Sequence, residues 1–147
     1  MIHLLDVNVL VALFDPSHVH HDAAHRWFQV ERVRGWATCP LTENGVVRVL
    51  SNPTYPGRRT TVADAVSRLT RFTASGGHQF WPADASLLGD RVIAASRISG
   101  YRQITDVYLL ALAVRHGGRL ATFDRGIPVV AVPEAGPEQI AVLPVGR

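Results

Sequence analysis

The chain has 147 residues, of which 47% are hydrophobic, and a formal net charge of +3. This length and composition predict a single domain over residues 1–147 with a sizeable core, and they exclude a disordered chain. All 15 basic residues are arginine, which excludes enzymes that need a P-loop lysine or a Schiff-base lysine. The arginine excess favours an anionic partner such as RNA.

No apolar run approaches the roughly 20 residues that span a bilayer, so we expect no membrane segment. The N-terminal residues 2–14 are interrupted by Asp6 and Asn8 and lack a basic start, which argues against a signal peptide. The single cysteine, Cys39, cannot form an internal disulfide. We therefore expect a cytoplasmic protein.

Short apolar segments alternate with amphipathic ones along the chain. We predict strands at residues 2–5, 35–39, 78–81, 119–123 and 140–143. We predict helices at residues 8–14, 17–34, 60–74 and 84–98, and two further helices that begin within the stretches 40–50 and 104–114. The alternation predicts an α/β fold with a mostly parallel sheet covered on both faces.

Several details of the helices can also be predicted. Thr42 and Thr105 are expected to be the N-caps of their helices. In the helix at 60–74 we expect an inward stripe formed by Val62, Val66, Leu69 and Phe72, and in the helix at 84–98 one formed by Leu87, Leu88, Val92 and Ala95.

Two of these helices begin with a carboxylate on the inward face. Asp106 precedes a stripe at the spacing of three, four, seven and eight residues, formed by Leu109, Leu110, Ala113 and Val114. Glu43 has the same relation to Val46, Val47 and Leu50. A carboxylate that points into a core is costly unless a cation or hydrogen-bond donors meet it. One such residue could be explained by the helix dipole, but two are harder to explain in this way.

Two further carboxylates, Asp6 and Asp124, follow predicted strands directly. Functional groups of parallel α/β proteins collect at the carboxyl ends of strands and at the adjoining helix starts, so we expect all four acidic residues at one edge of the sheet. Gathered carboxylates repel one another, and a hard cation such as Mg²⁺ or Mn²⁺ relieves the repulsion. Such an ion can activate water for hydrolysis of a phosphodiester.

Polar neighbours of the acidic residues are candidates for supporting roles. Asn8, Thr105 and Thr122 could orient the carboxylates or a bound water, and each could equally be a cap or turn residue. Arg125 directly follows Asp124 and Arg48 lies about one helical turn beyond Glu43 in sequence, and we expect both to bind RNA at the rim.

Two other polar segments have both a functional and a structural interpretation. His21 and His25 are four residues apart in a histidine-rich segment, but Asp22 stands where the zinc-protease pattern has glutamate. We therefore favour a solvated or partly packed face over a zinc site. In the loop at 52–59, Arg58 and Arg59 could touch a phosphate backbone or form a solvated pair.

Four short motifs contain the acidic residues in order. They are Leu5-Asp6-Val7-Asn8, Leu41-Thr42-Glu43, Ile104-Thr105-Asp106-Val107-Tyr108-Leu109 and Ala121-Thr122-Phe123-Asp124. With these motifs the chain resembles the PIN-domain ribonucleases, and specifically the VapC-type toxins of type II toxin–antitoxin pairs, over essentially its whole length. The resemblance implies a three-layer α/β/α fold with about five mostly parallel strands.

The resemblance also implies a function and partners. It implies Mg²⁺- or Mn²⁺-dependent endonucleolytic cleavage of RNA, with Asp6 and Asp106 as the firmest metal ligands. Glu43 and Asp124 would complete the pocket directly or through water. It further implies a homodimer, a small VapB-like antitoxin as partner, and transfer or ribosomal RNA as substrate.

Other functions remain open at this stage. A PIN-fold module could bind RNA or protein without cutting, and a PIN nuclease of RNA processing could act without an antitoxin. A metal-dependent phosphatase or a receiver-type domain is disfavoured, because both need a lysine near the phosphoryl group and this chain has none.

Overall fold

A parallel sheet of five strands forms the centre of the computed structural model, which describes residues 1–88 and 91–145. The strands are β1 (His3–Leu5), β2 (Trp36–Thr38), β3 (His78–Phe80), β4 (Arg119–Thr122) and β5 (Ile140–Val142). Their order across the sheet is β3-β2-β1-β4-β5, and every neighbouring pair is parallel. The five predicted strands and their parallel arrangement are therefore confirmed.

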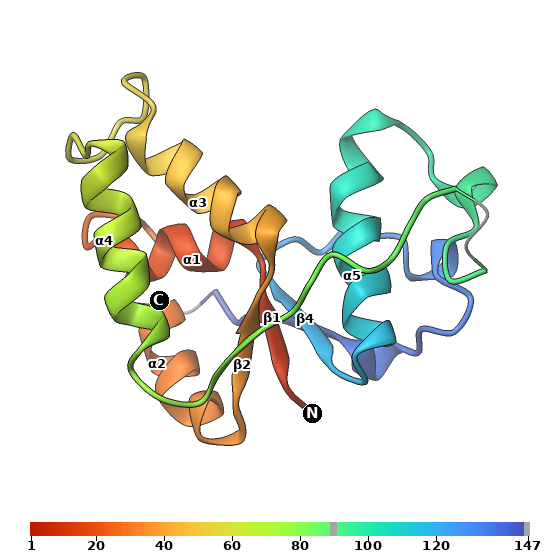
Figure 1. The fold of residues 1–147 in the computed structure, drawn as a ribbon. Helices are drawn as coiled ribbons and strands as arrows, with labels where there is room; N and C mark the ends of the chain where they lie inside the picture. The colour runs from red at the N-terminus through yellow and green to blue at the C-terminus, as the bar shows by residue number, and fades with distance from the viewer. Residues whose placement is uncertain (89–90, 146–147) are drawn as a thin grey trace.

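Helices cover both faces of this sheet (Figure 1). They are α1 (Val7–Phe14), α2 (His21–Glu31), α3 (Pro40–Ser51), α4 (Val62–Thr73) and α5 (Ile104–Arg115). Short 3-10 turns occur at Arg32–Arg34, Ala95–Arg97, Tyr101–Gln103, Val129–Ala131 and Pro137–Gln139. Figure 1 shows α1 to α4 on one side of the strands and α5 on the other, which is the three-layer α/β/α arrangement.

Each face of the sheet has its own hydrophobic core. Successive strand residues point to opposite faces, so Leu5 belongs to the core under α1 to α4, while Leu4 belongs to the core under α5. The middle of α5, from Leu109 to Ala113, is fully buried, because the helix packs directly on β1 and β4. None of the described helices is long and apolar enough to cross a bilayer.

Both predicted threonine N-caps are wrong. Helix α3 begins earlier, with Cys39 at the N-cap and Pro40 as the first helical residue, a position where proline costs nothing. The Thr42 hydroxyl instead accepts from the Cys39 N–H at 3.0 Å, from inside the first turn. Helix α5 follows the turn Tyr101–Gln103 directly, which makes Gln103 the N-cap and leaves Thr105 exposed as the second helical residue.

The predicted helix at 84–98 is also wrong over its described part, which forms extended and bent chain up to the turn Ala95–Arg97. Contacts with α5 compete with a local helix here. The Tyr108 hydroxyl donates to the Ala85 carbonyl at 2.9 Å, and the Asp84 carboxylate pairs with Arg115 at 3.5 Å. Leu88, expected inward, is 86% exposed.

The inward stripe of α4 is partly wrong as well. Val62 and Val66 are exposed, whereas Ala65 and Leu69 are buried. Helix α4 packs against α3 through Ala65 and Leu69, so the buried face is rotated relative to the predicted one.

Candidate active site

Asp6 is held by two hydrogen bonds at the point where β1 ends and α1 begins. One oxygen, Oδ1, accepts from the Val7 N–H at 2.7 Å, which makes Asp6 the N-cap of α1. The other oxygen, Oδ2, accepts from the Thr122 hydroxyl at 2.8 Å. The side chain is buried and fixed in orientation, so the capping role and a role in a site coexist in one residue.

Thr122 is the centre of the hydrogen-bond network at this edge. Its fully buried hydroxyl donates to Asp6 and accepts from Asn8 Nδ2 at 3.2 Å and from the Asp124 N–H at 3.0 Å. A hydroxyl offers one donor and two acceptor sites, so all three are in use. Asn8 Oδ1 also accepts from the Phe123 N–H at 3.2 Å. These bonds lock the start of α1 to the end of β4.

Asp106 is in the first turn of α5 and shares an electrostatic field with the other two aspartates. Burial raises the pKa of Asp106 to about 6, with further contributions from the charges of Asp6 and Asp124 and from a hydrogen bond with Asp124. Burial also raises the pKa of Asp6, and the charge of Asp124 adds to the rise, while the Thr122 and Val7 hydrogen bonds oppose it. Asp6, Asp106 and Asp124 therefore form one interacting set, the acidic cluster.

Glu43 belongs to a separate hydrogen-bond network in the first turn of α3. Its Oε2 accepts from the Thr38 hydroxyl at 2.7 Å, and the same hydroxyl is 2.7 Å from His78 Nε2. Because Thr38 has only one proton to donate, a bond to Glu43 requires His78 Nε2 to be the donor in the second bond. Burial lowers the pKa of His78, although the Glu43 charge opposes this shift.

Thr38 and His78 were missed by the sequence analysis. The available signal was Thr38 itself, a polar residue at the carboxyl end of a predicted strand and five residues before Glu43. His78 gave no comparable signal, because its contact depends on the pairing of β2 with β3, in which Trp36 is opposite His78.

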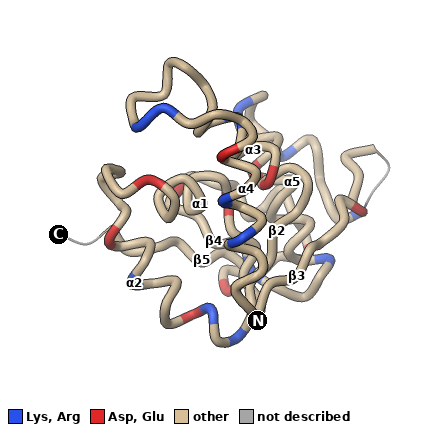
Figure 2. The backbone as a smooth tube through the Cα atoms, turned by 60° about the vertical axis from the view of Figure 1, so that its left-hand side comes forward, with Lys and Arg blue, Asp and Glu red and all other residues tan. Residues whose placement is uncertain are grey.

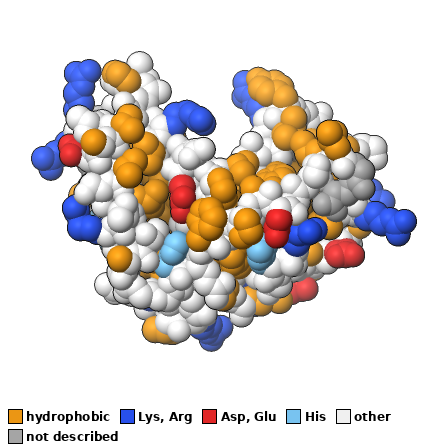
Figure 3. All heavy atoms as spheres, viewed as in Figure 1, with side chains coloured by type: hydrophobic (Ala, Val, Ile, Leu, Met, Phe, Trp, Pro, Cys, Tyr) orange, Lys and Arg blue, Asp and Glu red, His pale blue; other side chains and the backbone are white. Residues whose placement is uncertain are grey.

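Within the described residues, the side chains of Thr105, Arg48 and Arg125 form no hydrogen bond with these networks. Thr105, Arg48 and Arg125 are exposed. Across residues 1–88 and 91–145, neither arginine is within ion-pair distance of a carboxylate. Figure 2 shows acidic stretches of the chain near α3 and α5, and Figure 3 shows the surface hollowed between the α3–α4 side and the α5 side, with acidic side chains below the hollow.

The acidic cluster suits a hard divalent cation by its chemistry. Its donors are carboxylate oxygens, which Mg²⁺ and Mn²⁺ prefer. The pKa of Asp106 is raised by burial first and by the charges of Asp6 and Asp124 second, and a bound cation would offset both effects. In the part of the chain that the structure describes, no three His, Cys, Asp or Glu side chains form a closed group around one point. A cation here would thus have few direct carboxylate ligands and keep several waters, as Mg²⁺ commonly does.

The histidine-rich segment has a structural role. His21 Nδ1 is 2.7 Å from the Ala12 carbonyl, and His25 Nε2 is 3.0 Å from the Leu13 carbonyl. Carbonyl groups in the last turn of a helix lack intrahelical partners, so both rings satisfy the end of α1. The favoured interpretation, a partly packed face, agrees with these contacts.

Comparisons with known proteins show the family of the chain. The family model described as PIN domain matches residues 3–133. Ribonuclease VapC44 of Mycobacterium tuberculosis strain H37Rv is 49% identical over 140 residues, covering 95% of this chain and 98% of the relative. Ribonuclease VapC38 of the same strain is 50% identical over 128 residues, covering 87% and 89%.

A solved structure has a similar fold. It is the crystal structure of Mycobacterium tuberculosis VapC20, described as a sarcin-ricin loop cleaving toxin. It matches with a TM-score of 0.60 at 16% sequence identity, covering 92% of this chain and 99% of that one.

Proposed function

The chain belongs to the VapC family of PIN-domain ribonucleases, the toxins of type II toxin–antitoxin pairs, and on this premise we propose that its acidic cluster is the site of RNA hydrolysis. The observation that carries the proposal is the pKa of Asp106, raised to about 6 by burial and by the charges of Asp6 and Asp124. Strongly perturbed pKa values are concentrated at functional sites, which supports a catalytic role for the acidic cluster.

The proposed cofactor is Mg²⁺ or Mn²⁺, with Asp6 and Asp106 as its firmest ligands. Glu43 and Asp124 complete the pocket, directly or through water. Such an ion, when bound, lowers the pKa of a water and stabilises the charge that develops on the phosphate.

The remaining catalytic contribution comes from the orientation of the chain's own side chains. Thr122 and Asn8 hold Asp6 and the start of the Asp124 turn in register, which fixes where a carboxylate oxygen can meet a cation. Thr38 aims the Glu43 carboxylate in the same manner. Arg48 and Arg125 are proposed to bind the RNA strand at the rim, because four carboxylates alone would repel it.

The proposed partners follow from the family. We expect an RNA substrate, transfer or ribosomal RNA, a VapB-like antitoxin that neutralises the toxin, a homodimeric state, and a cytoplasmic location where these RNAs occur. Thr105, exposed at the start of α5, keeps its proposed supporting role only if its replacement by valine changes cleavage.

The test is cleavage of a bulk cellular RNA pool with Mg²⁺ or Mn²⁺ by the wild type, Asp6→Asn and Asp106→Asn. Asp22→Asn is the matched control, because Asp22 is an exposed carboxylate in the first turn of α2. We expect cleavage by the wild type and the control, abolition by EDTA, and a loss of at least about a hundredfold in both site variants. Activity that survives in both site variants would remove the acidic cluster from the reaction, and absence of cleavage by every protein would support the non-catalytic module.

A further inference from the structure

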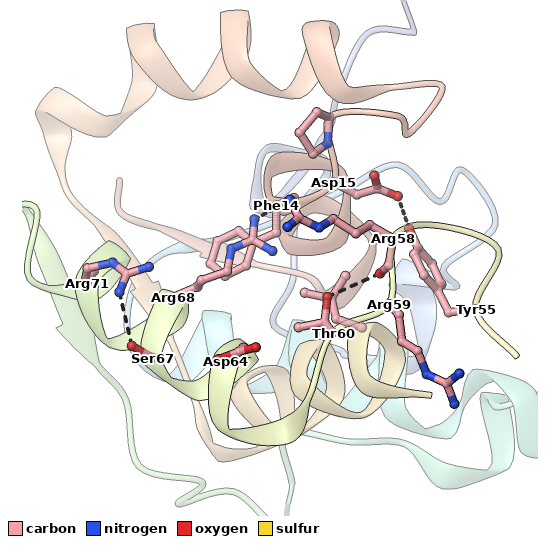
Figure 4. A pocket seen from close by; sticks show the side chains of 12 residues that line it. Phe14, Asp15, Tyr55, Arg58, Arg59, Thr60, Asp64, Ser67, Arg68 and Arg71 are labelled. Atoms are coloured by element: carbon pink, nitrogen blue, oxygen red, sulfur yellow. Dashed lines mark hydrogen bonds between the residues drawn. The ribbon is translucent and has the colours of Figure 1, made fainter. Parts of the chain in front are cut away.

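A cavity of about 420 Å³ lies away from the acidic cluster, between the end of α1, the loop joining α3 to α4, and α4 itself. Its lining includes four arginines, Arg58, Arg59, Arg68 and Arg71 (Figure 4). Phe14 and Tyr55 contribute aromatic surface. We call this cavity the arginine pocket.

The positive charge of the arginine pocket is not neutralised by its own carboxylates. Within the described ranges 1–88 and 91–145, none of the four guanidinium groups is within 4.0 Å of a carboxylate oxygen. Asp15 lines the pocket, but its Oδ2 accepts from the Tyr55 hydroxyl and its Oδ1 accepts from the Ser17 hydroxyl at 2.7 Å. Asp64 is exposed at the start of α4.

Two of the guanidinium groups converge inside the pocket. Figure 4 shows Arg58, from the loop, and Arg68, from α4, pointing toward one another near Phe14, whereas Arg59 points away. Arg68 is anchored, because its Nη2 donates to the Phe14 carbonyl and its guanidinium lies over the Phe14 ring at 5.2 Å from the centroid. Two like charges held in one cavity favour an anion between them.

Helix α1 connects the arginine pocket to Asp6 of the acidic cluster, and helix α3, which packs on α1, connects it to Glu43. Helix α1 begins at its cap Asp6 and ends at Phe14 in the pocket, a length of about 12 Å for its 8 residues. Helix α3 carries Glu43 in its first turn and Leu50, a pocket residue, in its last. Figure 2 shows the following loop projecting from the body and carrying a basic stretch. A strand of a few nucleotides covers this distance.

We propose that the arginine pocket binds a backbone phosphate of the RNA substrate, a few nucleotides from the scissile bond. The inference rests on the proposed function, because it assumes that RNA lies across the acidic cluster. Guanidinium groups bind phosphate oxygens in pairs, and phosphate contacts of this kind fix the register of a nucleic acid on a protein. The arginine pocket thus attracts the RNA at a place separate from the acidic residues, whose carboxylates alone would repel the strand.

The test measures RNA binding separately from cleavage. A short fluorescein-labelled RNA is titrated in EDTA against the wild type, Arg58→Gln and Arg71→Gln over a range of NaCl concentrations. Arg34→Gln is the control, since Arg34 is an exposed arginine outside the pocket and its loss changes the net charge equally. The Arg58 side chain is exposed and its replacement leaves the core intact.

We expect each pocket variant to weaken RNA binding about three- to tenfold and to lower the salt slope by about one, with Arg34→Gln close to the wild type. Equal binding by Arg58→Gln and the wild type, or an equal loss in Arg34→Gln, would overturn the proposal. The proposal would also be overturned if the pocket bound only free phosphate. In that case inorganic phosphate would raise the melting temperature of the wild type but not of Arg58→Gln, while both proteins bound RNA equally.

Two further outcomes separate this inference from other functions. If Arg58→Gln weakens binding of an acidic peptide but not of RNA, the pocket binds a protein segment and the proposal is wrong. If the wild type cuts RNA but the pocket variants bind RNA as tightly as the wild type, the assignment of the pocket is wrong and the proposed function still stands. If the wild type binds no RNA, both the pocket assignment and the proposed function fall.

Discussion

The acidic cluster and the arginine pocket are two gatherings of like charge built in different ways. The carboxylate of Asp6 is buried and fixed by hydrogen bonds from Thr122 and from the Val7 N–H. The guanidinium of Arg58 extends from an exposed loop, and only Arg68 among the pocket arginines is anchored to another segment, through the Phe14 carbonyl.

The difference follows from how each charge can be relieved. A carboxylate whose pKa is raised can take up a proton or meet a cation, so a carboxylate such as Asp6 can be buried and held in one orientation. A guanidinium stays charged at any physiological pH and can only be relieved by an anion, so it remains near solvent. The rigid site is therefore suited to aim a reaction, and the exposed site to attract a strand.

The largest expected effect comes from breaking the rigidity of the acidic side. Thr122→Val removes the hydroxyl that donates to Asp6 and accepts from Asn8 and the Asp124 N–H. We expect the free energy of unfolding to fall by about 2–3 kcal/mol, because Asp6 Oδ2 is left buried without the hydroxyl that donates to it. Urea denaturation measures the loss.

The control for this change is Thr122→Ser, which keeps the hydroxyl and loses a buried methyl worth about 1 kcal/mol. Equal stability of the valine and serine variants would mean that the network around Thr122 does not hold the acidic edge together.

The second effect concerns the orientation of Glu43. Thr38→Val removes the hydroxyl between Glu43 and His78, and we expect kcat for RNA cleavage to fall about tenfold while RNA affinity is retained. Thr42→Val is the control, because the buried Thr42 hydroxyl bonds only around Cys39. That variant should lose stability without losing kcat. A drop in kcat of the same size in both variants would argue against an orienting role for Thr38.

Much of the acidic edge could be predicted from the sequence, because it depends on local rules. Asp6 directly follows the last residue of β1 and Asp124 comes two residues after the end of β4, and parallel strands end at the same edge of a sheet. Asp106 was identifiable from helical periodicity alone, since its stripe includes the buried Leu109 and Leu110.

The features that could not be predicted depend on long-range contacts. The segment after β3 is apolar enough for a helix, but Tyr108 binds the Ala85 carbonyl and the segment follows α5 instead. The arginine pocket requires residues from α1, the loop after α3, and α4, and no sequence spacing brings Arg58 to Arg68. Helix α3 begins at Pro40 and not after Thr42, the expected N-cap, because proline is well suited to the first position of a helix.

The third effect tests the charge of the acidic cluster through its pH dependence. The pKa of Asp106 is raised from 3.8 to about 6 in the folded protein. The folded state therefore binds more protons than the unfolded state between these values, and stability falls as the pH rises through this window. Asp106→Asn removes the free-energy cost of ionising this carboxyl group in the folded protein.

We expect Asp106→Asn to be more stable than the wild type at pH 7 by on the order of 1 kcal/mol, after allowance for solvent screening of a half-exposed carboxylate. The advantage should shrink as the pH falls below about 6 and vanish only below about pH 3, where Asp106 is protonated in both states. The difference in stability between Asp106→Asn and the wild type is measured by thermal unfolding in EDTA at several pH values. Asp22→Asn, at an exposed carboxylate, is the control. A variant less stable than the wild type at pH 7 would show that the three aspartates do not repel one another as described.

The smallest expected effect concerns the arginine pocket, where removing a negative charge should strengthen RNA binding. Asp64 is the exposed carboxylate of the arginine pocket, in the first turn of α4, so Asp64→Asn should raise RNA affinity about twofold, a gain within the range of surface charge effects. Asp22→Asn is matched closely, because Asp22 is also exposed in a first helical turn but lies outside the pocket. Fluorescence anisotropy at low salt resolves the difference, which should disappear at high salt as the charges are screened. An equal gain from Asp22→Asn would mean that RNA responds to the net charge of the whole molecule, whereas a gain confined to Asp64→Asn would tie RNA binding to the pocket.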